Sequence, residues 1–241
     1  MAPASFQNAF PRDLLAGNGL AAANALLGAR LVRNDASGVR VGRIVELEAY
    51  GGHDDEASHA RFGRTSRNAV MFGPPGHAYV YLVYGMYDCL NVVIEPSGRA
   101  AALLVRSIEP LEGVDLMRHA REQRAAGRAL GRADRRDASA EDAARADAAR
   151  QRVAALPAAR LASGPGLVCA AFSVGREDGG ADLCDPASSL HLELAAPDDP
   201  PVERASGPRI GIGYAAEPWL GMPWRVWAAG NPAVTGPRMR R

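Results

Sequence analysis

The strongest constraint on the fold is a series of short apolar runs separated by turn-forming residues. Residues 31–33, 39–50, 77–84, 89–94 and 100–108 form such runs. Their lengths, and the glycine, proline, asparagine and aspartate residues between them, are typical of β-strands. Strands that follow one another through short turns pair in antiparallel fashion. The pattern therefore predicts an antiparallel sheet as the framework of the fold.

Helical spacing of apolar residues occurs near the start of the chain. Residues 11–29 predict a helix that stops at Gly28, and a second helix is expected near Leu111, where Pro110 ends the preceding strand. Further strands are expected at residues 190–194, 209–214 and 224–228. Because no repeat or linker divides the chain, we expect a single compact α+β domain over residues 1–241.

Bulk composition excludes several classes of protein. A hydrophobic fraction of 47% across 241 residues is enough for a substantial core. The sequence has no apolar run of about 18 residues, so no membrane span is predicted. Residues 1–10 lack the features of a signal peptide. Cys89, Cys169 and Cys184 are an odd number at wide spacing, which fits neither a disulfide framework nor a structural zinc site. We expect a cytoplasmic monomer without a cofactor.

The basic residues are unusual in kind and in distribution. All 28 are arginines, so no side-chain amine is available to form a Schiff base. Residues 117–160 hold 11 of them against 6 acidic residues, a local charge of +5, while the rest of the chain carries 17 − 21 = −4. This Arg- and Ala-rich segment is either a solvated or partly disordered insert or an arm that faces phosphate. The same two alternatives apply to Arg61, Arg64 and Arg67.

Two glutamates lie near the end of one predicted strand. Glu46 and Glu48 are two residues apart, so they share one face of that strand, and Tyr50 lies on the same face one pleat further along. This face is either a solvent-exposed strand edge or the carboxylate and aromatic ring of a base-binding pocket. The other face is apolar and consists of Val45, Leu47 and Ala49.

A dense group of histidines and acids follows in the long polar segment at residues 51–76. His53, Asp54, Asp55 and His59 are possible metal ligands, and a metal-dependent hydrolase that uses them is one alternative function. Their spacing matches no zinc pattern, however, and the acids could equally cap a helix. We therefore expect no metal site.

Aromatic residues gather in a hairpin whose turn is expected at residues 85–88. Four of the six tyrosines lie within residues 79–87. Tyr84, Met86 and Tyr87 lie at the predicted turn, where small polar residues are usual. These side chains either pack under the long preceding loop or form a wedge that enters stacked bases. The second alternative predicts binding to nucleic acid.

The same segments resemble the alkyladenine (3-methyladenine) DNA glycosylase family. The similarity runs from about residue 20 to residue 235 and is densest at residues 42–113. The matching motifs are GRIVELEAY at residues 42–50, DEASH at 55–59, RN at 67–68, MF at 71–72, YVYLVYGM at 79–86, Asn91, LVR at 104–106, EPLEG at 109–113, SGPG at 163–166, RIGIG at 209–213 and PWR at 223–225.

The resemblance implies a single α+β domain with a curved antiparallel sheet, flanking helices and a protruding β-hairpin. It implies a base-excision-repair enzyme that flips a damaged purine out of duplex DNA and hydrolyses its glycosidic bond. The expected partner is double-stranded DNA with alkylated or deaminated purines, such as 3-methyladenine, 7-methylguanine, hypoxanthine or ethenoadenine. Such an enzyme would be associated with the nucleoid through DNA binding.

Residue roles carry over by position. Glu48 resembles the general base that activates the attacking water, and Arg106 resembles the arginine that helps to hold this water. The expected base pocket consists of Tyr50, His59, Tyr81 and Asn91. In this resemblance, Asn91 disfavours a base with a 2-amino group, and the backbone of His59 contacts position 6 of the purine. The expected DNA contacts are Tyr84 as the intercalating wedge, with Met86, Tyr87, Arg64 and Arg67. One departure is Leu167, which replaces a family lysine expected to contact the DNA backbone.

The chemistry of base release is consistent with these residues. A purine glycosidic bond breaks through an oxocarbenium-like sugar, so the site needs a carboxylate and a positioned water rather than a strong nucleophile. The lack of lysine predicts a monofunctional enzyme that leaves the DNA strand uncut. A non-catalytic nucleic-acid-binding domain is a second alternative, because it would need the aromatic hairpin and the arginines but not Glu48 and Arg106.

Overall fold

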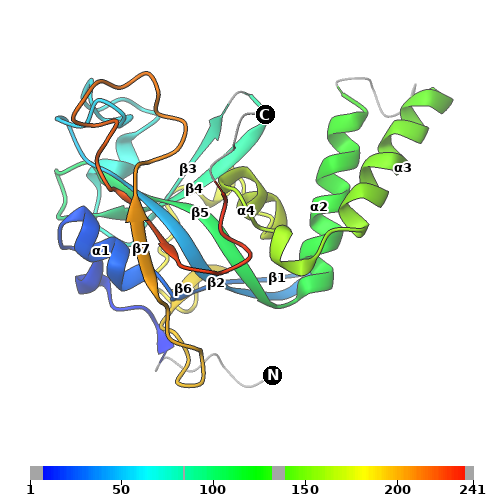
Figure 1. Ribbon diagram of the computed structural model, residues 1–241, viewed down its shortest axis with the longest axis horizontal. Coiled ribbons are helices and arrows are strands. Elements are labelled where there is room, and N and C mark those ends of the chain that lie inside the picture. Colours follow the sequence, from blue (N-terminus) through cyan, green and yellow to red (C-terminus); the bar gives the residue numbers. More distant parts are fainter. Residues whose placement is uncertain (1–7, 84, 132–138, 237–241) are drawn as a thin grey trace.

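A curled antiparallel sheet forms the centre of the computed structural model, which describes residues 8–83, 85–131 and 139–236 (Figure 1). In order of pairing, six strands are β3 (Ala78–Val83), β4 (Tyr87–Ile94), β5 (Ala101–Glu112), β2 (Gly38–Tyr50), β1 (Arg30–Asp35) and β6 (Leu190–Glu193). Strands β7 (Arg204–Gly207) and β8 (Arg225–Ala228) pair with each other, and β8 also pairs with β2. The predicted α+β class with an antiparallel sheet is confirmed.

Strand β2 is the central strand, and it changes neighbour halfway along. One edge pairs with β5 from Val41 to Tyr50. The other edge pairs first with β1 and then, at Glu46–Glu48, with β8. The register between β2 and β5 shifts around Val45, which is typical of a β-bulge. Val45 packs with Ala228 and Ala233, apart from the main core that contains Leu47. The expectation that Val45 shares the face of Leu47 is therefore wrong.

The described helices flank the sheet. The expected helix at residues 11–29 is two elements, because Asn18 caps a new helix by accepting a hydrogen bond from the Ala21 N–H at 2.9 Å. The helices are η2 (Arg12–Leu15), α1 (Gly19–Leu26), η3 (Ala69–Phe72), α2 (Val114–Ala129), α3 (Ala140–Ala154), η4 (Ala158–Arg160), α4 (Pro165–Ala171) and η5 (Arg176–Asp178).

Two expectations about the strands are wrong: where one strand ends, and whether another exists. Strand β5 continues through Pro110, which lies opposite Gly42 at a second register shift of β2, so α2 begins only at Val114. Residues 209–214 form no strand. The backbone N–H of Ile210 donates instead to the Glu48 side chain, which a strand ladder would not allow.

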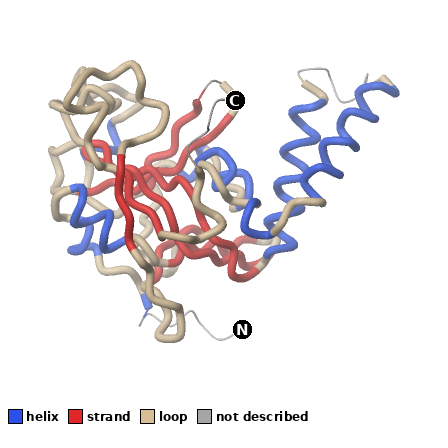
Figure 2. Tube along the Cα trace, viewed as in Figure 1, coloured by secondary structure: helices blue, strands red, loops and turns tan. Residues whose placement is uncertain are grey.

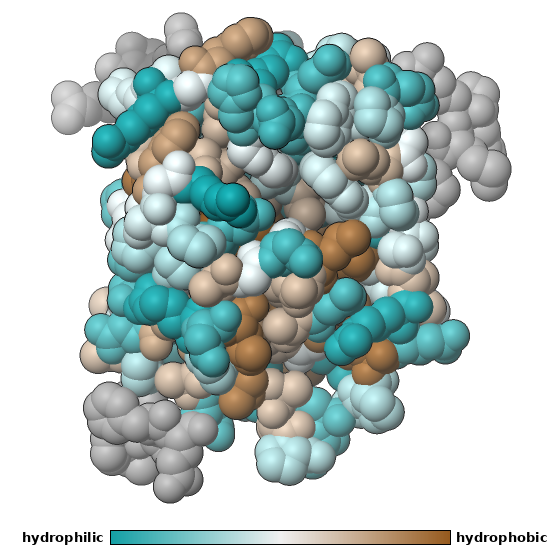
Figure 3. Space-filling model, turned by 90° about the vertical axis from the view of Figure 1, so that its left-hand side faces the viewer, coloured by the Kyte–Doolittle hydropathy of each residue, from teal (hydrophilic) through white to brown (hydrophobic). Residues whose placement is uncertain are grey.

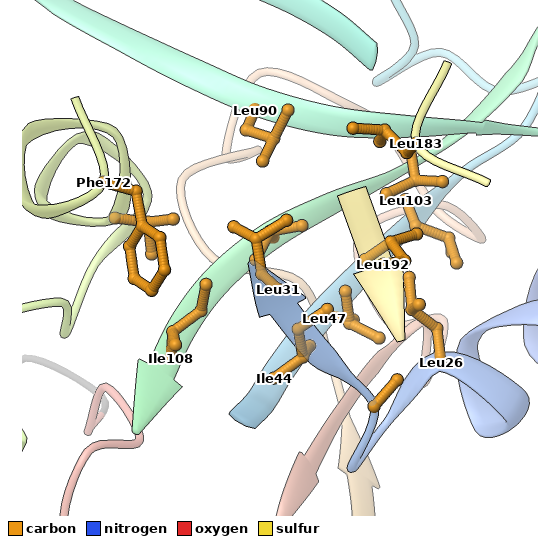
Figure 4. Packing of buried hydrophobic residues seen from close by; sticks show 14 of the residues in the cluster. Leu26, Leu31, Ile44, Leu47, Leu90, Leu103, Ile108, Phe172, Leu183 and Leu192 are labelled. Carbon is orange, nitrogen blue, oxygen red and sulfur yellow. The ribbon is translucent and has the colours of Figure 1, made fainter. Parts of the chain in front are cut away.

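The main hydrophobic core lies on the sheet face that α1 and α4 cover. Figure 4 shows Leu47, Leu90 and Leu103 from the sheet, with Leu26 from α1 and Phe172 next to α4. Each of these side chains is at most 1% exposed. Full burial of a side chain of this kind contributes about 1.5–3 kcal/mol. Because this face is filled by core residues, polar side chains on the same strands must lie on the other face.

Helices α2 and α3 stand side by side at the edge of the molecule, and α4 lies between them and the sheet (Figures 1 and 2). The described parts of the Arg-rich segment at residues 117–160 are therefore mostly helical; residues 132–138 lie outside the described part of the chain. Seen from the α1 side, hydrophobic residues form separate patches among hydrophilic ones (Figure 3). Of the helices described, none has the length and apolar character that a bilayer crossing requires.

Candidate active site

Strand alternation gathers the predicted site on the sheet face opposite the main core. Leu47, Leu103 and Val105 are buried in the core, so the residues between or beside them project to the other side. The site side chains that the sheet supplies in this way are Glu48 and Tyr50 from β2, Tyr79 and Tyr81 from β3, Asn91 from β4, and Leu104 and Arg106 from β5.

Glu48 is fully buried and receives three hydrogen bonds. Its Oε2 accepts from the Tyr50 hydroxyl at 2.9 Å and from Arg106 Nη1 at 3.2 Å, and its Oε1 accepts from the Ile210 backbone N–H at 2.6 Å. Burial opposes the charged guanidinium of Arg106, but attraction by Glu48 and Glu46 outweighs it and raises the pKa of Arg106. Burial, followed by the negative charge of Glu48, raises the pKa of Tyr50. Tyr50 therefore acts as a neutral donor to the carboxylate.

Glu46 lies on the same side of β2 but in a different environment. Its carboxylate accepts hydrogen bonds from Arg106 Nε and Arg225 Nη1, both at 3.1 Å, and from the Ser107 hydroxyl at 3.1 Å. The backbone N–H and hydroxyl of Thr235 add bonds of 2.8 and 2.7 Å. We call these five residues the hub. The alternative of a solvent-exposed strand edge is wrong for both glutamates, since both are 0% exposed.

A cavity of about 450 Å³ opens on this face of the sheet. Glu48 does not line the cavity itself, but it is bonded to Tyr50 and Arg106, which do. The volume lies in the usual range for small-molecule sites. Other lining residues are Ala57, His59, Arg67, Met71, Tyr79, Tyr81, Leu82, Val83, Cys89, Asn91, Ala102, Leu104, Pro165, Ile210, Gly211, Ile212 and Tyr214.

Three aromatic side chains form one wall of the cavity. The rings of His59 and Tyr81 meet edge to face with centroids 4.4 Å apart, and Tyr79 stacks on Tyr81 at 5.4 Å. His59 Nδ1 lies 3.1 Å from the Tyr79 hydroxyl. Desolvation, followed by the charges of Arg67 and Arg61, lowers the pKa of His59. The imidazole is thus neutral near pH 7, and the wall is electron-rich without a net charge.

Of the remaining predicted residues, Asn91 and Arg67 lie at the cavity and Arg64 does not. Asn91 is buried at the cavity and donates from Nδ2 to the Tyr79 carbonyl at 3.0 Å, which fixes its orientation. Arg67 lies at the cavity over the Tyr81 ring, 5.7 Å from its centroid. Arg64 is exposed and does not line the cavity. The cavity thus unites Tyr50, His59, Tyr81, Asn91, Arg67 and Arg106.

The expected turn between β3 and β4 is described only in part. The two strands pair from Ala78 with Val92 to Val83 with Tyr87, but the predicted wedge, Tyr84, lies outside the described residues. Met86 is 54% exposed. The Tyr87 ring lies beneath the guanidinium of Arg128, with 3.7 Å between the guanidinium carbon and the ring centroid. Tyr87 is thus packed against α2.

The arginines of α2 bind the protein itself. Arg124 forms an ion pair of 2.7 Å with Asp88, and Arg128 donates to the Met86 carbonyl at 2.9 Å, so both hold the start of β4. Arg118 donates to three carbonyls at the end of α3, and Arg121 to the carbonyl of Leu161. These contacts do not support the alternative in which α2 is an arm that faces phosphate.

The acidic and histidine cluster is not brought together as a metal site. Asp55 is 1% exposed and forms a two-pronged ion pair with Arg209, at 2.6 and 2.9 Å. His53 and Asp54, in contrast, are exposed. Within the described ranges, no three or more His, Cys, Asp or Glu side chains are grouped as metal ligands would be. The metal-hydrolase alternative therefore lacks its ligand set.

Several residues of the site were not predicted from the sequence. Tyr79 and Tyr214 line the cavity, Ile210 holds Glu48, and Arg209 lies behind Tyr50. Tyr79 could have been found, because strand alternation places it on the same face as Tyr81. The other three lie in residues 209–214, which the apolar pattern assigned to a strand.

Comparisons with known proteins agree with this geometry. The model of the methylpurine-DNA glycosylase family matches residues 13–232. A relative from Methanocella arvoryzae is 42% identical over 230 residues, covering 93% of this chain and 94% of the relative. A relative from Nitrosospira multiformis is 40% identical, covering 89% of this chain and 88% of the relative. A relative from Bacillus cereus is 37% identical, covering 93% of this chain and 98% of the relative. All three bear the name "Putative 3-methyladenine DNA glycosylase". The chain therefore belongs to the methylpurine-DNA glycosylase family.

Proposed function

We propose that this protein is a monofunctional DNA glycosylase that hydrolyses the bond between a damaged purine and its deoxyribose. The observation that carries the proposal is the buried Glu48, held by Tyr50 and Arg106 at an aromatic-walled cavity. An extruded purine fits such a cavity because its faces can stack on the aromatic side chains. Its partner is double-stranded DNA that contains alkylated or deaminated purines.

In the proposed reaction, Glu48 acts as the general base. A water molecule loses a proton to the carboxylate and attacks C1′ of the sugar, while the electron pair of the glycosidic bond leaves with the base. The three donors to Glu48 use only part of the acceptor capacity of its two oxygens. Arg106 lines the cavity and binds the Glu48 carboxylate, so its positive charge can orient the water beside that carboxylate.

The aromatic wall supports a preference for cationic bases. Alkylation at N3 or N7 gives the purine a positive charge and makes it a better leaving group. The faces of Tyr50 and Tyr81 attract such a cation by about 0.5–2 kcal/mol. Neutral His59 adds no repulsion. Asn91 donates to the Tyr79 carbonyl and lines the same cavity, which supports a role for it at the edge of the base.

A base-release assay on duplexes with defined lesions tests the proposal. The wild-type protein is expected to release alkylated or deaminated purines and to leave the strand intact until alkali or heat is added. Glu48→Gln should bind the same duplex without releasing the base. Release that depends on an added metal, or DNA binding with no release by the wild type, would contradict the proposal; the second result would favour the binding-domain alternative.

Borohydride trapping tests the monofunctional mechanism separately. Strand-cleaving glycosylases form a Schiff base between an amine and the sugar, and this chain has no lysine. We expect no covalent adduct between protein and DNA. A trapped adduct that disappears when the terminal amine is blocked would show that the N-terminus is part of the active site.

Tyr84 is proposed as the wedge that fills the gap left by the extruded base. Tyr84→Ser should slow release from duplex DNA and should matter much less when the lesion is in a single strand or an unpaired bulge, where little unstacking is needed. Met86→Ala is the matched variant at the exposed neighbouring position. Equal losses on paired and unpaired substrates would show that Tyr84 is only structural.

A further inference from the structure

A buried arginine lies over one face of the Tyr50 ring. The guanidinium carbon of Arg209 is 4.8 Å from the centroid of Tyr50 and 4.9 Å from that of Trp224, so the cation is held between two rings. Its side chain is 0% exposed. Tyr50 lines the cavity, whereas Arg209 does not. Tyr50 thus contacts a fixed positive charge and also lines the proposed base site.

Asp55 is the counter-ion of this arginine. Its two oxygens accept from Arg209 Nη1 at 2.6 Å and Nη2 at 2.9 Å. The same oxygens accept from the backbone N–H groups of Gly51 and Ala57, at 2.9 and 3.0 Å. The pair is therefore fixed in position, and because both side chains are excluded from water, solvent screens it little.

The position of the pair makes its charge balance important for a stacked base. A base on the open face of Tyr50 would lie about 3.5–4 Å from the ring, which places it within reach of the Arg209 charge. Removing only one partner of a buried ion pair leaves an uncompensated charge. That charge would act directly on a base at Tyr50.

We propose that Arg209 and Asp55 are a specificity-determining pair, in which Asp55 cancels the Arg209 charge behind Tyr50 and so sets the relative excision of cationic and neutral damaged purines. The inference rests on the proposed glycosylase function. It adds that the pocket accepts bases of both charges because the charge behind its stacking ring is balanced. Arg209 is a positioning residue as well, since the next residue, Ile210, donates to Glu48.

The two kinds of base respond in opposite ways because they carry different charges at the transition state. When the C1′–N9 bond breaks, its electron pair moves to the base. Cationic 7-methylguanine becomes neutral, whereas neutral hypoxanthine gains negative charge until it takes up a proton. At the transition state the bond is only partly broken, so the first base still carries part of its positive charge and the second carries a partial negative charge. Measured as kcat/KM, an unpaired Arg209 would therefore disfavour the first base and favour the second.

The test compares kcat/KM for 7-methylguanine and hypoxanthine in matched duplexes. Asp55→Asn should raise the ratio of hypoxanthine to 7-methylguanine excision on the order of tenfold. Arg209→Gln leaves Asp55 unpaired and should lower the same ratio. The double variant removes both charges, so its ratio should return towards that of the wild type even if both rates fall.

The Arg33–Asp178 ion pair provides a matched control. It is 2.7 Å long and mostly buried, and Asp178 also accepts from a backbone N–H, but neither residue lines the cavity. Asp178→Asn should lower stability without changing the ratio. If Asp55→Asn fails to fold, Arg209→Gln carries the test with the opposite sign. Wild-type excision with an unchanged ratio in the folded Asp55 or Arg209 variants overturns the inference; no excision by the wild type overturns the proposed function instead.

Discussion

The hub around Glu46 and the pocket side around Glu48 place the same residue type in two different settings. Both carboxylates are fully buried, lie on the same side of β2 and bind Arg106. Glu46 is enclosed by two arginines, a serine and a threonine that donates twice. Glu48 has one shared arginine, one tyrosine hydroxyl and one backbone N–H, and all three of these donors belong to residues that line the cavity.

This difference separates structural from chemical use of a carboxylate. A buried charge that is saturated by fixed donors is stable but has little capacity left to accept a proton. A buried charge with fewer donors, next to a space that can admit water and substrate, can take part in proton transfer. The number of donors and the position of the cavity distinguish the two glutamates, whereas their spacing in the sequence does not.

The largest effect is expected for Glu48→Gln. The amide keeps the shape of the side chain but cannot accept the proton of the attacking water, so single-turnover base release should fall by about 10²–10⁴-fold. Glu109→Gln is the matched control, since Glu109 is a β5 carboxylate bound by Arg43 at 2.5 Å and does not line the cavity. Release by Glu48→Gln at a rate near that of the wild type would contradict the assignment.

Glu46→Gln should affect stability rather than chemistry. Loss of the charge leaves the guanidinium groups of Arg106 and Arg225 without one of their acceptors. Breaking such a buried pair typically costs about 3–5 kcal/mol, which urea unfolding would measure. A variant as stable as the wild type would show that the hub is not structural.

Tyr50→Phe and Thr235→Val extend the comparison to single donors. Each replacement removes a hydroxyl that donates to one of the two carboxylates, at 2.9 Å in the pocket and 2.7 Å in the hub. Hydrogen bonds to charged groups contribute about 1.5–3 kcal/mol. Tyr50→Phe should therefore slow base release by roughly tenfold to a hundredfold, whereas Thr235→Val should mainly lower the melting temperature. The reverse pattern would mean that the roles of the two regions are exchanged.

Much of the site could be predicted because it lies on strands. Alternation along β2 and the motifs on β3, β4 and β5 identified Glu48, Tyr50, Tyr81, Asn91 and Arg106, and the cavity unites the last four of these residues. Strand periodicity is a local property, so it can be read from consecutive residues. The sheet as a whole was predictable for the same reason.

Long-range pairing explains the residues that the sequence did not predict correctly. Asp55 was a possible metal ligand until its partner, Arg209, was placed beside it, 154 residues away in the chain. Residues 209–214 have an apolar strand pattern, but the N–H of Ile210 serves a side chain instead of a ladder. The number of arginines in residues 117–160 left a solvated insert and a phosphate-facing arm as alternatives, whereas Arg124 and Arg128 bind the start of β4. No local pattern reveals such partners.

The smallest expected effect is a pH dependence that only the pocket shows. Desolvation and the charges of Arg67 and Arg61 lower the pKa of His59 from its usual 6.5, so the folded protein favours the neutral imidazole. Below about pH 6.5 the unfolded chain takes up this proton first, and the contribution of His59 to stability decreases as the pH falls.

The melting temperatures of the wild type and His59→Gln should therefore differ most near pH 8 and less at about pH 5.5. His59 is exposed enough that solvent reduces its effect on stability. The quantity to measure is therefore the difference in melting temperature between the wild type and His59→Gln, compared at the two pH values. Thr235→Val is the control, because the hub contains no histidine and its difference from the wild type should be nearly the same at both pH values. If the His59 difference instead grew on acidification, the imidazole would be favoured in its charged form, and a pocket wall without net charge would no longer be tenable.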